Sequence, residues 1–106
     1  MIDKTSIIDI ISRLERNQAR KILSAILNRY GLSKISFTRH CLEELQKDNM
    51  TVVDVFNVLK RGQIFKDPEW TKGTYRYRVE TSIMLVVIGF SPPDCVRCVT
   101  AWRKKI

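Results

Sequence analysis

The chain lacks most of the motifs by which enzymes hold metals, cofactors or nucleotides. It contains no glycine-rich phosphate loop, no HExxH or GxSxG motif, and no run of closely spaced carboxylates that could bind Mg²⁺. It also lacks a long apolar run, because the longest uninterrupted one extends only from residue 83 to residue 88. We therefore expect no cofactor, no bound metal and no membrane partner, and we expect any reaction to depend on side chains alone.

Cysteine and histidine are scarce. The 106 residues include three cysteines and one histidine, His40, and no secretory features flank the cysteines. An odd number of cysteines argues against a disulfide framework and favours a reducing, cytoplasmic location. Cys95 and Cys98 have CxxC spacing, but the chain has no second such pair. We interpret them as core or solvent-facing thiols rather than as zinc or redox ligands.

Positive charge is what the chain has in excess. Lys and Arg number 19 against 11 Asp and Glu, which gives a net charge of +8, and residues 60–106 supply +6 of it. Such a field attracts polyanions without specifying their sequence. We expect nucleic acid or an acidic protein as the partner, and simple solubility is the alternative explanation.

Two kinds of periodicity divide the chain. Apolar residues first recur every three or four positions, which predicts helices over residues 7–14, 19–30, 37–45 and 52–59. Thr38 is expected to cap the third helix, and Thr51 with Asp54 resembles a capping box for the fourth. Gly31 and Gly62 are expected to end the second and fourth helices.

From residue 64 onward the apolar residues alternate, which predicts strands. An antiparallel meander is expected over residues 75–81, 83–90 and 95–102, with a short extra strand at 63–65 and a loop at 67–73. The middle strand is apolar at almost every position, which indicates burial on both faces. We therefore predict an α+β fold in a single domain, residues 1–106, with N-terminal helices followed by a three- or four-stranded antiparallel sheet.

The same segments contain the side chains that RNA cleavage would need. Cleavage through the 2′-hydroxyl requires a base for its proton, cations for the charge on phosphorus, and an acid for the leaving oxygen. His40 can act as the base or the acid because imidazole titrates near neutral pH. A capping or surface role for this lone histidine is the alternative.

Basic and aromatic residues alternate in the first predicted strand of the meander. Arg76 and Arg78 should share one sheet face as a phosphate clamp, and Tyr75 and Tyr77 should lie on the other. We expect one tyrosine in the core and the other in a groove, where it can stack on a base or donate a proton. A solvated edge strand protected by charge is the alternative for the arginines.

Other candidate ligands are scattered along the chain. At the end of the last strand only one of Trp102 and Arg103 can face a groove, and we favour Arg103. The remaining candidates for nucleic-acid binding are Arg39, Lys60, Arg61, Trp70, Lys72 and Tyr77. Lys60 and Arg61 can equally be cations that stabilise a helix C-terminus, whereas an exposed Trp70 beside Lys72 could stack on a base or anchor a partner protein.

The segments 37–45, 50–55, 60–62 and 75–79, together with the final Trp102-Arg103, resemble a small family of domains of unknown function. That family is grouped with RelE-, BrnT- and MqsR-like bacterial toxins, and the resemblance covers residues 35–103. It implies a RelE-like core that works without a metal and is inhibited by a cognate antitoxin. By position it assigns the site to His40, Arg76, Arg78 and Arg103. Residues 1–33 would be a helical extension.

These observations predict a metal-independent endoribonuclease toxin of a toxin–antitoxin system that cleaves mRNA, free or on the ribosome. His40, Arg78 and Arg103 are its expected catalytic residues. The alternative is a non-catalytic module that binds nucleic acid or an acidic protein through the same basic face. Gyrase poisoning is a further possibility for a relative of this fold. A third hypothesis makes residues 1–33 an assembly surface, for example of a homodimer.

Overall fold

The computed structural model describes residues 10–105. The helices are α1 (Arg16–Tyr30), α2 (Arg39–Lys47) and α3 (Val52–Arg61), with a 3₁₀ turn, η2 (Gly31–Lys34), after α1. The strands are β1 (Ile35–Phe37), β2 (Glu69–Thr71), β3 (Thr74–Glu80), β4 (Met84–Ser91) and β5 (Cys95–Arg103). Helices come first along the chain and most of the sheet follows, so the α+β fold class is confirmed.

The predicted helix boundaries are largely confirmed. The Thr38 hydroxyl accepts a hydrogen bond from the Cys41 N–H at 3.0 Å and caps α2. The side chains of Thr51 and Asp54 form the expected capping box at the start of α3. Gly31 follows the last residue of α1 with a φ of 60°, a conformation that favours glycine.

The predicted first helix differs from the structure where it can be compared. Residues 1–9, which contain the start of that helix, lie outside the described residues. Residues 10–12 form a turn and a bend, and residues 13–15 precede α1 without regular structure. Leu14 is nevertheless buried, so an apolar residue that looked like part of a helical stripe enters the core from an irregular segment.

The sheet is larger than predicted and is mixed. Its five strands lie in the order β1-β5-β4-β3-β2, and the central three form the expected antiparallel meander. The prediction of a wholly antiparallel sheet with three or four strands was wrong, because β1 pairs in parallel with β5. β1 has only three residues, which is too few to show an alternating pattern in the sequence. It forms a strand because it pairs with β5, which lies far away in the sequence.

The segment between α3 and β3 also differs from the prediction. The expected loop at 67–73 contains β2, which forms a hairpin with β3 around Lys72 and Gly73. Both residues have positive φ, 50° and 80°, as a two-residue hairpin turn requires. The expected strand at 63–65 is reduced to a single bridge between Gln63 and Glu80.

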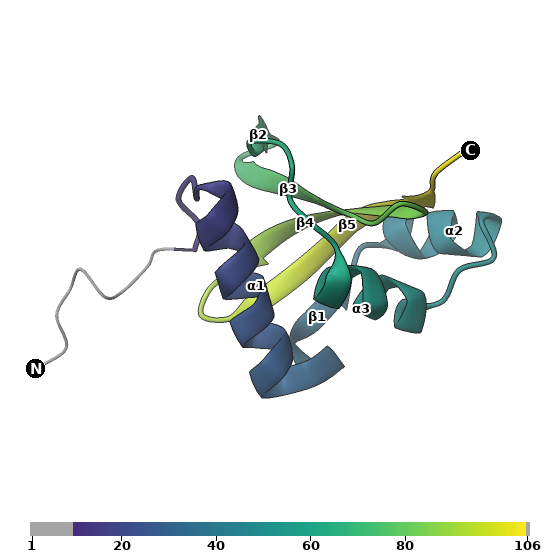
Figure 1. Ribbon diagram of the computed structural model, residues 1–106, viewed down its shortest axis with the longest axis horizontal. Coiled ribbons are helices and arrows are strands. Elements are labelled where there is room, and N and C mark those ends of the chain that lie inside the picture. Colours follow the sequence, from purple (N-terminus) through teal and green to yellow (C-terminus); the bar gives the residue numbers. More distant parts are fainter. Residues whose placement is uncertain (1–9, 106) are drawn as a thin grey trace, which may run out of the picture.

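All three helices contribute to one core on one face of the sheet, as Figure 1 shows. The strand residues that face this core include Tyr77, Val79, Val86, Ile88, Val96, Cys98 and Ala101. α1 buries an apolar stripe in the same core, and the Arg20 guanidinium on α1 donates to the carbonyl of Gly62 at 2.6 Å. None of the helices within residues 10–105 is long and apolar enough to cross a membrane.

Within residues 10–105, no helix packs against the second face of the sheet, and we call it the open face. Alternate residues of β3 and β4 lie on this face, together with the residues of β5 that pair with them. They include Arg76, Arg78, Val87, Gly89, Arg97, Thr100 and Trp102. A β-bulge interrupts β5, because Val87 pairs with Thr100 while the next residue, Ile88, pairs with Cys98. The extra residue reverses the alternation of side chains in the second half of β5.

Candidate nucleic-acid interface

A cavity of about 290 Å³ lies on the open face, and we call it the arginine cavity. Its residues come from β3, β4, β5 and the β2 segment, and they are Asp67, Glu69, Thr71, Arg76, Arg78, Val87, Thr100 and Trp102. It thus combines two guanidinium groups with an indole ring and two carboxylates. This is the side-chain chemistry that holds phosphates and stacks on bases.

The two arginines of the cavity differ in their partners. Arg78 forms an ion pair with Glu69, at 3.2 Å between Nη2 and Oε1. Arg76 has no ion pair with any residue in 10–105, and its Nε is buried without a hydrogen-bond partner. The prediction that Arg76 and Arg78 share one face is confirmed, and Arg76 is the less neutralised of the two.

A second hollow of about 70 Å³ adjoins the arginine cavity, and we call it the glycine notch. Its lining residues are Thr38, Thr74, Arg76, Gly89, Phe90, Ser91, Arg97 and Val99. Arg76 lines both hollows, so they are neighbours on one face. Sequence reasoning missed Arg97, although its alternation with the buried Val96 and Cys98 was a signal that could have placed it on the open face.

Arg103, which the sequence analysis favoured over Trp102, does not line the arginine cavity. Trp102 lines the arginine cavity, whereas the backbone N–H of Arg103 donates to the Asp48 carboxylate at 2.9 Å. The Arg103 guanidinium also donates to the Asp48 carbonyl at 3.3 Å, just beyond the end of α2. The bulge in β5 is the physical cause, because it puts Thr100 and Trp102 on the open face and turns Arg103 away from it.

His40 is not among the residues of either hollow. It lies in the first turn of α2 and is exposed, and its imidazole makes no hydrogen bond or ion pair with another residue of the described range. Its neighbour Arg39 is 94% exposed and pairs with Glu43 at 3.7 Å on the same helix. The structure therefore does not bring the imidazole together with Arg76 and Arg78.

Lys60 and Arg61 also lie outside the arginine cavity. Both are in the last turn of α3, a helix that packs on the core face of the sheet. The Lys60 ammonium lies 5.6 Å from the centre of the Phe56 ring, and Arg61 lines a separate hollow with Ile83. Their position favours the alternative interpretation, in which they stabilise the C-terminus of a helix.

Tyr77 and Trp70, the aromatic residues predicted to bind nucleic acid, do not line the arginine cavity. Tyr77 is 1% exposed, and its hydroxyl accepts a hydrogen bond from the Leu14 N–H at 2.9 Å. Burial raises the pKa of Tyr77 above its ordinary value. Its side chain points into the core, so Tyr77 does not line the arginine cavity. Trp70, which is 62% exposed, packs edge-on against Tyr75 with 4.7 Å between ring centres, near the Lys72 turn.

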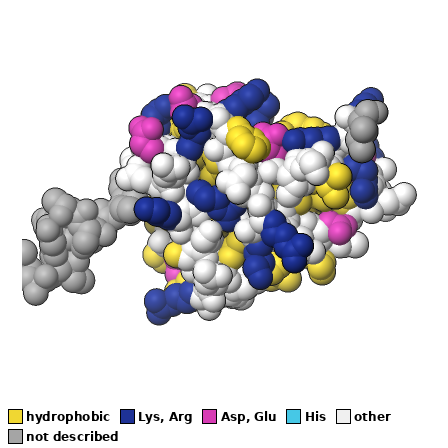
Figure 2. Space-filling model, viewed as in Figure 1, with side chains coloured by type: hydrophobic (Ala, Val, Ile, Leu, Met, Phe, Trp, Pro, Cys, Tyr) yellow, Lys and Arg dark blue, Asp and Glu magenta, His cyan; other side chains and the backbone are white. Residues whose placement is uncertain are grey.

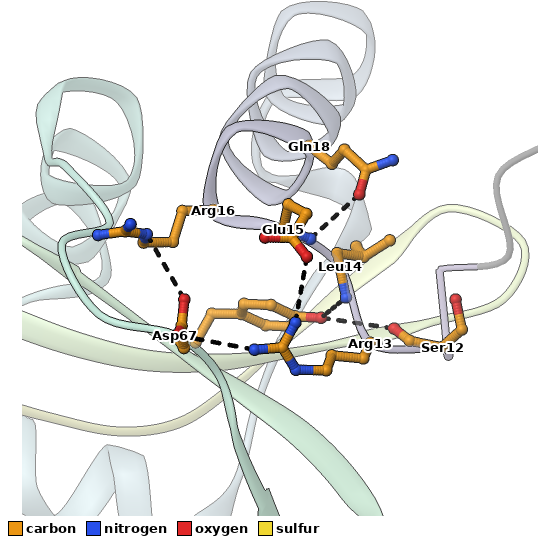
Figure 3. A network of polar contacts seen from close by, with 8 residues as sticks. Ser12, Arg13, Leu14, Glu15, Arg16, Gln18 and Asp67 are labelled. Carbon is orange, nitrogen blue, oxygen red and sulfur yellow. Dashed lines mark hydrogen bonds and ion pairs between the residues drawn. The ribbon is translucent and has the colours of Figure 1, made fainter.

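The segment before α1 fixes one wall of the arginine cavity. Figure 3 shows the Asp67 carboxylate between Arg13 and Arg16, with distances of 3.7 Å and 3.6 Å. Arg16 also donates to the Phe65 carbonyl at 2.7 Å. Asp67 lines the cavity, so α1 and the residues before it position an acidic group beside the arginines.

All three cysteines are free thiols. Cys41 and Cys98 are buried, Cys95 is partly exposed, and none of the three forms a disulfide. Burial raises the pKa of Cys41 to about 11, and burial raises that of Cys98 further. Within residues 10–105 no group of three or more His, Cys, Asp or Glu side chains is placed to hold a metal ion.

Lys and Arg side chains do not form one continuous patch on the face that Figure 2 shows. Figure 2 shows Lys and Arg side chains at several places on the visible face, with acidic side chains between some of them.

Comparison with family models identifies residues 37–103 as a match to "Domain of unknown function (DUF4258)". The chain belongs to the DUF4258 family. Searches among curated proteins and solved structures find no match. All residues that line the arginine cavity and the glycine notch lie within the DUF4258 segment, whereas α1 lies before it.

Proposed function

We propose that this DUF4258 protein is an RNA-directed protein of the toxin type, which binds a single RNA strand on its open face and cleaves it. The observation that supports this function is the arginine cavity, in which Arg76, Arg78 and Trp102 face the same 290 Å³ space. Guanidinium groups bind phosphates through paired hydrogen bonds, and an indole ring stacks on an unpaired base. A single strand offers both groups at once.

The width of the cavity favours a single strand over a duplex. Its lining residues come from four adjacent strands, β2 to β5, a width of about 14 Å at the usual strand spacing of about 4.8 Å. Stacking on Trp102 requires a base that has left its own stack, which loops and single strands supply readily. Because phosphate contacts and stacking do not read base edges, we expect weak sequence preference.

The proposed reaction is an endonucleolytic cleavage that uses side chains alone. A base removes the 2′-hydroxyl proton, the 2′-oxygen attacks phosphorus, and the 5′-oxygen leaves with a proton from water. Arg76 and Arg78 would neutralise the charge that develops on the phosphate. Two bases are candidates: Glu69 inside the arginine cavity, and His40 on α2, which an RNA strand reaches only if it extends beyond that cavity.

One observation favours a second function, that of a non-catalytic module. His40 and Arg103, two of the three residues expected to catalyse cleavage, do not line the arginine cavity. Under this alternative the open face binds RNA or an acidic protein and leaves it chemically intact. Binding would weaken steeply with salt, and replacement of His40 would have little effect.

The partners and location follow from the toxin proposal. We propose cytoplasmic mRNA, free or ribosome-bound, as the substrate and an acidic antitoxin as the inhibitor, in keeping with a net charge of +8. A homodimer through residues 1–33 is also proposed. Its surface would not be the apolar stripe of α1, because Ala19, Leu23, Ile26 and Leu27 are already buried within the chain.

Mapping of RNA ends after induction in bacteria tests the proposed function. We expect growth arrest with discrete new ends from the wild-type protein, and loss of both with Arg78→Ala. Lys60→Ala is the matched control, since it removes a cation that lies on α3 and lines neither hollow. Growth arrest with DNA damage and intact RNA would indicate gyrase poisoning instead.

The same variants in purified form separate cleavage from binding. If His40 is the base, His40→Ala should abolish cleavage while RNA binding persists, and Glu69→Gln should do so if Glu69 is the base. Binding without cleavage by the wild-type protein would support the non-catalytic module. A wild-type protein that neither binds nor cuts single-stranded RNA would refute both functions.

A further inference from the structure

The open face contains a second place where a polyanion can approach the backbone closely. We infer that the glycine notch is a phosphodiester site, in which one phosphate of the RNA strand lies over Gly89 between Arg76 and Arg97. This inference rests on the proposed function, because it extends the path of the same RNA strand beyond the arginine cavity.

The strand register places the two guanidinium groups on either side of the glycine. Gly89 on β4 pairs directly with Arg97 on β5. On the other side Tyr77 pairs with Ile88, and continuing that register puts Arg76 opposite Gly89. Two strand spacings separate the arginine backbones by about 10 Å, a gap that two long side chains can close around one phosphate.

The glycine is not needed for the fold, and this makes its position informative. Its φ lies outside the positive range, and a Cβ added there would meet only the Tyr75 carbonyl, at an ordinary 3.5 Å. A strand interior disfavours glycine, which there often marks a close approach of a ligand. Gly89 is itself buried, and with no side chain at this position it lines a hollow of about 70 Å³ together with the two cations.

The two arginines of the glycine notch form no ion pair within residues 10–105. Neither Arg76 nor Arg97 forms an ion pair with a residue of the described range, whereas Arg78 has Glu69 and Lys104 has Glu80. The residues that line the notch include no acidic side chain. An anion bound here would therefore not have to displace a carboxylate, in contrast to one bound at Arg78.

The position of Arg76 favours RNA over an acidic peptide. Because Arg76 lines both hollows, a ligand in the notch continues directly into the cavity that contains Trp102. A nucleic-acid strand alternates phosphates with flat bases and can supply an anion to the notch and a ring to Trp102. A run of aspartate or glutamate side chains supplies anions but no ring to stack.

Filling the notch without changing its charge tests this site. The variants are Gly89→Ala and Gly89→Val, with Arg97→Gln to remove a cation and Arg61→Gln as the control. Arg61 is an exposed arginine on α3 that lines neither hollow. Binding of a fluorescent 12-nucleotide single-stranded RNA is measured by anisotropy over a range of salt concentrations, and thermal unfolding checks the fold of each variant.

We expect Gly89→Val to weaken RNA binding by about tenfold or more relative to the wild type. Gly89→Ala should also weaken binding, by a smaller factor. Both Gly89→Val and Arg97→Gln should reduce the slope of log K against log salt by about 0.7, the value for one lost phosphate contact on a single strand. Arg61→Gln should bind as the wild type does. If Gly89→Val fails to fold, Gly89→Ala and Arg97→Gln decide the test.

The outcomes distinguish the notch from the wider proposal. Wild-type affinity and slope in Gly89→Ala and Arg97→Gln, with weakened binding in Arg78→Ala, would refute the notch and leave RNA binding intact. Wild-type protein that binds a poly-glutamate peptide but not the RNA would refute the phosphodiester assignment together with the proposed function. Wild-type protein that binds neither ligand would refute both as well.

Discussion

The hydroxyl of Tyr77, at the centre of the core, accepts a hydrogen bond from the backbone N–H of Leu14 at 2.9 Å. The two residues are 63 positions apart, and both are about 1% exposed. This bond joins the irregular segment before α1 to the sheet. The same segment places Arg13 and Arg16 around Asp67, so the buried bond also supports one wall of the arginine cavity.

Replacement of Tyr77 by Phe should therefore destabilise the fold without touching the open face. The change leaves the buried Leu14 N–H without its partner, and we expect the free energy of unfolding to fall by about 1–3 kcal/mol. Urea unfolding measures it. Tyr75→Phe is the control, since no hydrogen bond of its hydroxyl is found among residues 10–105. Equal stability of the two variants would show that the Leu14 bond contributes little.

At Gly62, backbone atoms of neighbouring residues leave no room for a side chain. Its φ is −73°, which any residue adopts, but a Cβ there would lie 2.7 Å from the Val58 carbonyl and 3.0 Å from the Glu80 carbonyl. Gly62→Ala should thus force α3 away from β3 and lower the free energy of unfolding by about 1–3 kcal/mol. Gly89→Ala, which has room for a methyl group, is the matched comparison and should change stability little. The reverse order of the two variants in urea unfolding would contradict this account.

Glu69 should limit the affinity of the arginine cavity for RNA. The Glu69 carboxylate forms an ion pair with the Arg78 guanidinium, at 3.2 Å between Oε1 and Nη2. A phosphate that binds Arg78 has to displace this carboxylate. We expect Glu69→Gln to tighten RNA binding by about threefold at low salt, with a smaller gain at high salt, because salt screens exposed charges. Anisotropy titrations measure the change, and Glu43→Gln is the control because its partner, Arg39, lies on α2. Weaker binding by Glu69→Gln would show that the carboxylate contacts the RNA favourably.

Much of the fold could be predicted because local signals and the final contacts agree. Thr38, Thr51 and Asp54 act as caps through residues at most three positions away, so a single sequence contains the whole signal. The alternation of β3 placed Arg76 and Arg78 correctly for the same reason. Strand β1 could not be predicted in this way, because its three residues form a strand only by pairing with β5, about 60 positions later.

The candidate site was predicted less well, and the bulge in β5 explains the main error. Simple alternation from the buried Cys98 would bury Thr100 and Trp102, but the extra residue at Val99 buries Ala101 instead. No glycine or proline marks this bulge in the sequence, so Trp102 was passed over in favour of Arg103. His40 was predicted as a catalytic residue because imidazole can act as an acid or a base. The sequence does not show where α2 packs, and in the structure His40 lines neither hollow.

Alkaline pH should unfold this protein through its buried thiols. Burial raises the pKa of Cys41 from 9.0 to about 11, so the thiol stays neutral in the folded protein where it would already ionise in the unfolded chain. Cys98 shifts in the same direction. The unfolded state then binds fewer protons than the folded state, and stability falls as pH rises above 9 and until the folded pKa values are passed.

Urea unfolding between pH 8 and pH 11 measures this effect, with a slope of at most about 1.4 kcal/mol per pH unit for each thiol. Cys41→Ala should flatten the decline, although it lowers stability at every pH by creating a cavity. Cys95→Ala should keep the wild-type slope, since both buried thiols remain. A Cys41→Ala variant whose stability declines as steeply as that of the wild type would show that Cys41 does not cause the alkaline loss.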